Sequence, residues 1–286
     1  MYPKSQFKSM RLWRSLLTAL LCFSSGLMPL PAQVIAAPQR AAKTQTLFQT
    51  PASFRPPKGR GAPRQSVGAG TRGNCMATES TGSQAQKPLT AIVPVNRADT
   101  NNSVGLTLSE HPTFLIYIPK TTAKTAEFYL EEELPSAVGS SAQAKALYTT
   151  QVSLPRQAGF IKVQLPQNNI ALEPGKIYRW YFTLNCSDSN DPTANAGAPF
   201  VSGIVQRVDQ PDLAQQLSSV PVIQQVALYG KAGIWYDMIA ALADLRRSRP
   251  TDATLTTKWV TELSSDVVGL PELSGEPLIS CCSSRN

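Results

Sequence analysis

The sequence of 286 residues contains a single histidine, His111, and this scarcity removes most nucleophile–base triads. It also has no G-x-S-x-G motif, no P-loop and no G-x-G-x-x-G after an expected strand. No C-x-x-C pair accompanies the lone histidine, so the ligand spacing of a tetrahedral zinc site is absent. His111 precedes Pro112 at the start of an expected strand, where we expect a surface or turn residue. The sequence therefore predicts no catalytic residue, no metal ligand and no cofactor.

Acidic side chains are missing from the first 73 residues. Residues 1–37 carry four basic residues and residues 38–73 carry seven, whereas residues 74–286 carry 16 basic and 19 acidic residues. The formal net charge of +8 therefore comes from the N-terminal quarter, and the expected folded part is mildly acidic. Because a nucleic-acid interface needs basic residues on the folded surface, no nucleic-acid partner is expected.

Long apolar runs are also lacking, and the longest one fits an export signal. A basic segment ends at Arg14, an apolar stretch covers 16–28, and small residues suited to cleavage end at Ala36 or Ala37. This stretch is shorter than the ~20 residues of a membrane span, so a retained anchor is the weaker alternative. Residues 1–37 are predicted to be a signal peptide, with no transmembrane segment after cleavage, and the product is expected to be secreted or periplasmic.

Residues 38–73 are predicted to form a disordered basic linker. The stretch 54–64 mixes proline, glycine and arginine with few side chains to bury. It could be a solvated linker, or it could make a weak electrostatic contact with an anionic surface.

Cysteine usage agrees with export. Four cysteines follow the signal peptide: Cys75, Cys186, Cys281 and Cys282. An even number in an exported chain suggests disulfides, and bonding between adjacent cysteines is strained. We favour a bond between Cys75 and Cys186 and leave the C-terminal pair open; free buried thiols are the alternative.

Seven short strands are expected between residues 74 and 208. They are rich in β-branched and aromatic residues, and turn signals separate them; they cover 89–95, 112–119, 127–130, 146–152, 159–165, 176–184 and 200–208. The acidic run 131–133 is read as a solvated turn after its strand. This pattern predicts an antiparallel β-sandwich of the fibronectin or immunoglobulin type.

A local motif supports this fold class. The spacing of Leu172, Pro174 and Tyr178 is typical of a tyrosine corner, in which the hydroxyl bonds to the chain just upstream. The alternation along 178–186 assigns Tyr178 and its equivalents to the core. Arg179 and Tyr181 point the other way and are predicted to lie on the surface.

The pattern becomes helical after residue 209, and 209–286 is predicted to be a small helical module. Ile234, Met238, Leu242 and Leu245 recur at the spacing of a core-facing stripe, and Pro250 ends that helix. A single tetratricopeptide unit is an alternative, but no second copy follows, so packing against the sandwich, or of the helices on each other, is favoured. The chain is thus predicted to be α+β, a sandwich followed by helices.

Three sequence segments carry a family resemblance: 112–119, 174–186 and 233–246. In this order they resemble a secreted cyanobacterial family described as domain of unknown function 928, over about residues 60–282. The resemblance implies a photosynthetic bacterial source and an envelope or extracellular location. It brings no activity, cofactor or catalytic residue.

The expected function is that of an exported, non-enzymatic interaction module of the envelope or extracellular space. Its partner would be an unidentified protein or envelope polymer, contacted through Arg179, Tyr181, Tyr236 and Asp237. One alternative is a periplasmic hydrolase that acts on polysaccharide or peptide through paired carboxylates, which requires two close carboxylates in a cleft. Another is a structural component of the envelope.

Overall fold

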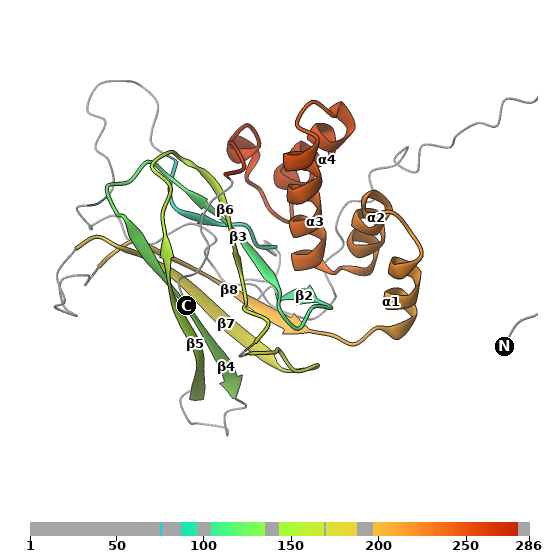
Figure 1. Cartoon of the computed structure of the whole chain (residues 1–286), viewed down its shortest axis with the longest axis horizontal. Helices are drawn as coiled ribbons and strands as arrows, with labels where there is room; N and C mark the ends of the chain where they lie inside the picture. Colours follow the sequence, from blue (N-terminus) through green and yellow to red (C-terminus); the bar gives the residue numbers. More distant parts are fainter. Residues whose placement is uncertain are drawn as a thin grey trace, which may run out of the picture. The chain divides into compact units, whose positions relative to one another are not determined.

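A computed structural model describes residues 75, 87–95, 104–134, 143–168, 170–187 and 197–279. The predicted signal peptide, the basic linker, Cys281 and Cys282 lie outside these residues. Figure 1 shows the described elements, which comprise two sheets and four α-helices. The predicted α+β class is confirmed.

The smaller sheet has three antiparallel strands in the order β1–β3–β6. They are β1 (Thr90–Ala91), β3 (Thr113–Ile118) and β6 (Gly159–Gln164). The segment after the helices runs along the outer edge of β6. The Phe160 amide donates to the Pro277 carbonyl at 2.8 Å, and the Ile279 amide donates to the Phe160 carbonyl at 2.9 Å. This segment therefore covers backbone groups that an edge strand would otherwise expose.

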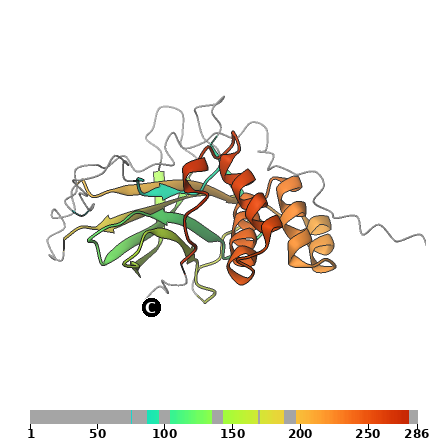
Figure 2. The same ribbon diagram turned by 90° about the horizontal axis from the view of Figure 1, so that it is seen from above.

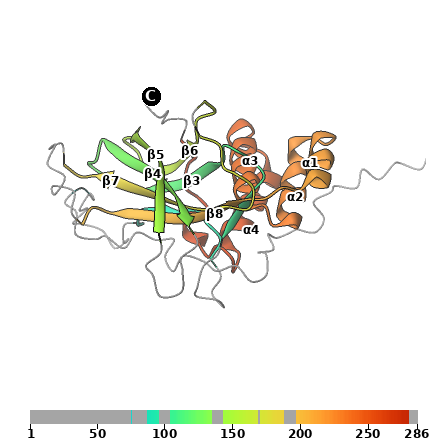
Figure 3. The ribbon, with the colours of Figure 1, turned by 90° about the horizontal axis from the view of Figure 1, so that it is seen from below.

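The larger sheet has five strands in the order β2–β8–β7–β4–β5. They are β2 (Gly105–Thr107), β8 (Phe200–Arg207), β7 (Ile177–Asn185), β4 (Thr125–Leu134) and β5 (Gln143–Ser153). All of its pairs are antiparallel except β2 with β8, which is parallel. Each of the seven predicted strands is present, and β2 was not predicted. Figure 3 shows strands of both sheets running toward the helices.

The alternation of apolar residues in β4 and β7 produces the core face of the larger sheet. Tyr178, Trp180, Phe182 and Leu184 of β7 are all buried, as expected from the sequence. The hydroxyl of Tyr178 accepts a hydrogen bond from the Glu173 amide at 2.9 Å. This is the upstream contact that the tyrosine-corner spacing predicts, and it fixes the entry to β7.

Four helices follow β8 along the chain: α1 (Pro211–Ser218), α2 (Val222–Ala232), α3 (Trp235–Ser248) and α4 (Ala253–Ser264). Gly233 ends α2 with a φ of 75°, a left-handed conformation that favours glycine. The Asp252 carboxylate caps α4 by accepting from the Thr254 amide at 2.9 Å. A short 3₁₀ turn, η1 (Pro271–Leu273), follows. Figure 2 shows the helices grouped beside the strands.

Helix α3 connects the helices to both sheets. It packs against β2 and β3, and also against α2 and α4. Its side chains Trp235, Met238 and Leu242 belong to the same apolar core as the inner residues of the sheets. A smaller cluster brings Ile234 together with Ile204 of β8 and Leu213 of α1. The helices thus pack both against the strands and against each other, the two arrangements that the sequence left open. No helix in the part of the chain that the structure describes combines the length and apolar character that a bilayer span requires.

Candidate interaction surface

The outward faces of β4 and β7 carry a continuous group of tyrosines and charged residues. We call it the tyrosine–carboxylate face; its members are Glu127, Tyr129, Glu131, Glu133, Arg179 and Tyr181. They alternate along their strands with the buried core residues, so all six project from the side of the sheet opposite the core. In the register, Tyr129 lies opposite Tyr181 and Glu131 lies opposite Arg179.

The two tyrosines of this face form a pair beside one carboxylate. Their ring centroids are 6.0 Å apart, and the rings are tilted by 43°. The Tyr181 hydroxyl donates to Glu131 Oε1 at 3.1 Å. Burial and the charge of Glu131 raise the pKa of Tyr129. Burial, assisted by the charge of Glu131, raises the pKa of Tyr181 to about 12. Both hydroxyls therefore stay protonated at neutral pH.

Arg179 forms an ion pair within the same face. Its Nε lies 2.6 Å from Glu133 Oε1, and its Nη2 lies 2.5 Å from the same oxygen. The side chains of Arg179 and Glu133 remain 25% and 31% exposed. Because the face holds three carboxylates and one guanidinium, its formal charge is negative even after this pairing.

An exposed aromatic ring continues the face onto β8. Phe200 is 40% exposed and lies opposite Thr183 in the register, on the same side of the sheet as Tyr181. A single exposed apolar side chain is normal on a protein surface, so Phe200 adds aromatic area to the face without marking a contact by itself. The face thus combines aromatic area with unbalanced negative charge.

The sequence predicted only part of this face. Arg179 and Tyr181 are at the surface as predicted. Glu131 and Glu133 were missed because β4 was expected to stop at residue 130, whereas it continues to Leu134. Tyr129 lies within the predicted strand but was not assigned to a surface. The alternation of Glu127, Tyr129, Glu131 and Glu133 was the available signal, and a β-bulge between Leu130 and Glu131 interrupts the pairing where the expected turn was placed.

Tyr236 does not belong to a surface, and its assignment to the interaction surface was wrong. It is 1% exposed, and its hydroxyl accepts from Trp180 Nε1 at 2.9 Å and donates to the Ile204 carbonyl at 3.1 Å. Its ring also packs edge-on against Phe114, with centroids 5.3 Å apart. The expectation failed because α3 is covered on several sides, so residues outside the apolar stripe are buried too.

Asp237 is half-buried and also turns inward. Its Oδ2 accepts from Thr107 Oγ1 at 2.7 Å and from the Leu108 amide at 3.2 Å, which ties the first turn of α3 to the end of β2. Burial raises the pKa of Asp237, and the hydrogen bonds from Thr107 and Leu108 oppose this shift. Burial and the charge of Asp237 raise the pKa of the neighbouring Tyr229 to about 12. Asp237 therefore joins two elements and does not extend the tyrosine–carboxylate face.

A shallow depression of about 490 Å³ lies between the start of α2 and the end of α3. Its lining residues are Val222, Asp244, Leu245, Arg247 and Ser248. Asp244 is the one carboxylate among them, and it pairs with Lys162 Nζ at 2.6 Å and Arg247 Nη2 at 2.8 Å. The two close carboxylates that the hydrolase alternative requires are not found in this lining. Within the described residues, no group of three or more His, Cys, Asp or Glu side chains could hold a metal ion.

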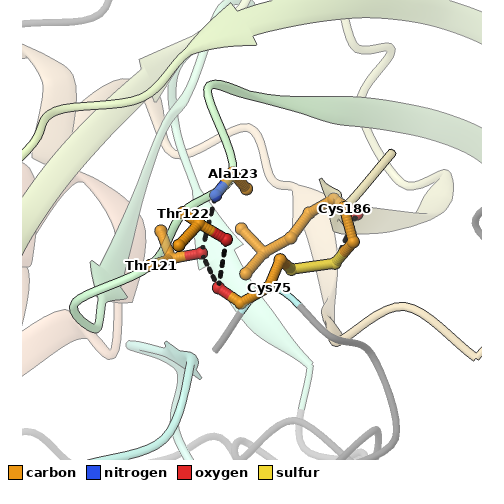
Figure 4. The surroundings of a disulfide bond; sticks show 6 residues. Cys75, Thr121, Thr122, Ala123 and Cys186 are labelled. Atoms are coloured by element: carbon orange, nitrogen blue, oxygen red, sulfur yellow. Dashed lines mark hydrogen bonds between the residues drawn. A yellow bond between two sulfur atoms is a disulfide. The ribbon is translucent and has the colours of Figure 1, made fainter. Parts of the chain in front are cut away.

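The predicted disulfide between Cys75 and Cys186 is present, with the two Cα atoms 5.0 Å apart (Figure 4). Cys75 is buried, and its carbonyl accepts from Thr121 Oγ1 at 2.6 Å and from the Thr122 amide at 2.9 Å. The bond fixes the chain before β1 to the residue just after β7. It therefore attaches the segment preceding Cys75 near one end of the strand that carries Tyr181 and Arg179.

The family model described as Domain of Unknown Function (DUF928) matches residues 67–278. This range includes both bonded cysteines, both sheets and all four α-helices. The chain belongs to this family. Among curated proteins, none matches the chain. Membership in the DUF928 family brings no activity, so function must be argued from the surface itself.

The tyrosine–carboxylate face offers groups of the kind that binding surfaces use. Two rings offer flat area for stacking, and their surrounding carboxylates accept hydrogen bonds or attract cations. Each strongly placed group, Glu131, Glu133 or Arg179, is held by a neighbour on the same face. A prearranged surface of this kind contacts a ligand without losing much conformational entropy.

Proposed function

We propose that this DUF928 protein is an exported, non-enzymatic interaction module of the cell envelope or extracellular space, from a photosynthetic bacterium. Residues 1–37 would be removed on export. A fibronectin- or immunoglobulin-like β-sandwich, followed by a small helical module, would present the tyrosine–carboxylate face to a protein or envelope polymer. The disulfide between Cys75 and Cys186 supports export, because disulfides persist in oxidising compartments outside the cytoplasm.

The single observation that carries this proposal is the pairing of Tyr129 with Tyr181 on a rigid sheet, beside Glu131. Tyrosines account for a large share of binding energy at interfaces because they offer large contact area with few rotatable bonds. Here the pair stands half-exposed, beside the exposed ring of Phe200. Both rings project from the side of the sheet opposite the core, where they are available to a partner as well as to each other.

The test is capture of partners from periplasm and culture medium by immobilised protein, with quantification by mass spectrometry. We expect the double variant Tyr129→Ala/Tyr181→Ala to retain at least tenfold less of any specifically bound partner, because each lost anchor costs about 2 kcal/mol. The matched control is Val222→Ala/Val260→Ala, which removes two exposed apolar side chains from α2 and α4.

Equal capture by wild type and the tyrosine variant would show that this face is not the contact. Loss in the control to the same degree would show non-specific adhesion. N-terminal sequencing of the protein from culture medium checks export separately, because an intact leader would contradict that part of the proposal.

A further inference from the structure

The negative charge of the tyrosine–carboxylate face favours a positively charged ligand. Glu127 is exposed, and Glu131 accepts a hydrogen bond from the Tyr181 hydroxyl. Arg179 balances only one of the three carboxylates. A cationic ligand gains attraction from the remaining two, and its guanidinium or ammonium groups can also lie over the tyrosine rings.

The chain itself contains a segment of matching chemistry. Residues 54–64 contain four basic residues and three prolines, and residues 38–73 contain no acidic residue. Proline-rich segments dock onto tyrosine-lined surfaces with little entropic cost, and neighbouring carboxylates orient their basic residues. The charge and side-chain types of residues 54–64 thus complement those of the face.

The disulfide places this segment within reach. Cys186 follows β7 directly and lies five positions after Tyr181, which corresponds to about 17 Å along a strand. Arg64 lies 11 residues before Cys75, and 11 residues of fully extended chain span at most about 37 Å. Arg64 and the residues before it can therefore reach Tyr181 and Arg179 in the same molecule.

We propose that residues 54–64 dock on the tyrosine–carboxylate face of their own chain. Prolines 56, 57 and 63 contact the rings of Tyr129 and Tyr181, and the basic side chains pair with the carboxylates. The docking itself does not depend on the function proposed above, since it requires no partner.

Cross-linking with a water-soluble carbodiimide tests the contact, because this reagent joins a lysine to a carboxylate in direct contact. Lys58 is the one lysine between residues 44 and 86. In the full chain at low salt, we expect a link from Lys58 to Glu127, Glu131 or Glu133, identified by peptide mass spectrometry. The yield should fall at least fivefold in 1 M salt, which shortens the Debye length to about 3 Å.

Matched variants show whether the link is specific. Lys58→Arg keeps the charge but removes the reactive amine, so the link should disappear. Glu272→Gln removes an exposed glutamate on η1 and should leave the yield unchanged. Links from Lys58 to Glu272 as frequent as those to the face would overturn the proposal.

A mixture of ¹⁵N-labelled and unlabelled protein separates links within one chain from links between two. In a 1:1 mixture, links within one chain are never mixed-isotope, whereas about half of the links between copies are mixed. A mixed fraction near one half would show exchange between copies and would overturn the proposal as stated. Proteolysis gives a second, independent measurement. Trypsin should cut after Lys58 and Arg60 at least fivefold faster in Glu127→Gln/Glu131→Gln/Glu133→Gln than in wild type, and equal rates would also overturn it.

Discussion

At the scale of single residues, two glycines make the central aromatic contacts possible. A Cβ atom on Gly105 would lie 2.5 Å from Tyr236 Cε2, and one on Gly203 would lie 2.7 Å from the Trp180 indole. Neither ring can move freely, because Trp180 Nε1 donates to the Tyr236 hydroxyl and both rings pack against Phe114. The absence of these two side chains lets α3 approach the strands closely.

Replacing Gly203 by alanine should therefore destabilise the protein by overpacking. We expect the free energy of unfolding to fall by about 1–3 kcal/mol, although alanine usually favours the folded state over glycine in regular structure. Gly275→Ala is the control, since a Cβ there meets nothing within 4 Å. Urea denaturation measures both variants, and equal stability of the two would refute this account of Gly203.

At the scale of elements, the sequence predicted correctly which side chains face the core where apolar residues recur with a regular period. The strict alternation of β7 gave its inner and outer faces, and with them Arg179 and Tyr181. It could not give β2, because three residues are too short to show a period of two and a parallel partner requires long-range information. The expectation that α3 buries only its apolar stripe likewise failed for Tyr236, because α3 packs against helices as well as strands.

The link between α3 and β2 predicts a specific pH dependence. Burial raises the pKa of Asp237 above its usual 3.8, so the unfolded chain loses this proton at a lower pH than the folded chain. The folded state then binds more protons between the two pKa values, and the free energy of unfolding falls as pH rises through that window.

Comparison of wild type with Asp237→Asn isolates this contribution. The asparagine oxygen can still accept from Thr107 and Leu108, but the side chain no longer titrates. The wild-type free energy of unfolding, minus that of the variant, should decline from about pH 4 upward and level off above the folded-state pKa. Urea denaturation at a series of pH values measures it; a difference that rises with pH would reverse the assigned direction.

At the scale of the whole molecule, one covalent bond closes most of the strand-forming chain. Cys75 precedes β1 and Cys186 follows β7, with 111 residues of sequence separation. The bond therefore restricts the unfolded state of both sheets at once, while β8 and the helices lie outside the closed loop. A constraint of this length is the largest single restriction on the unfolded chain that the structure shows.

Loss of this bond should cost about 2–5 kcal/mol, a value typical for a native disulfide. We expect Cys75→Ala/Cys186→Ala to melt at a lower temperature than wild type and to be insensitive to added reductant. Cys281→Ser/Cys282→Ser is the control, because reductant should lower its melting temperature through the remaining bond. Calorimetry with and without reductant measures all three proteins. If the alanine variant melted at the wild-type temperature, the sheets would be held by their apolar core without help from the disulfide.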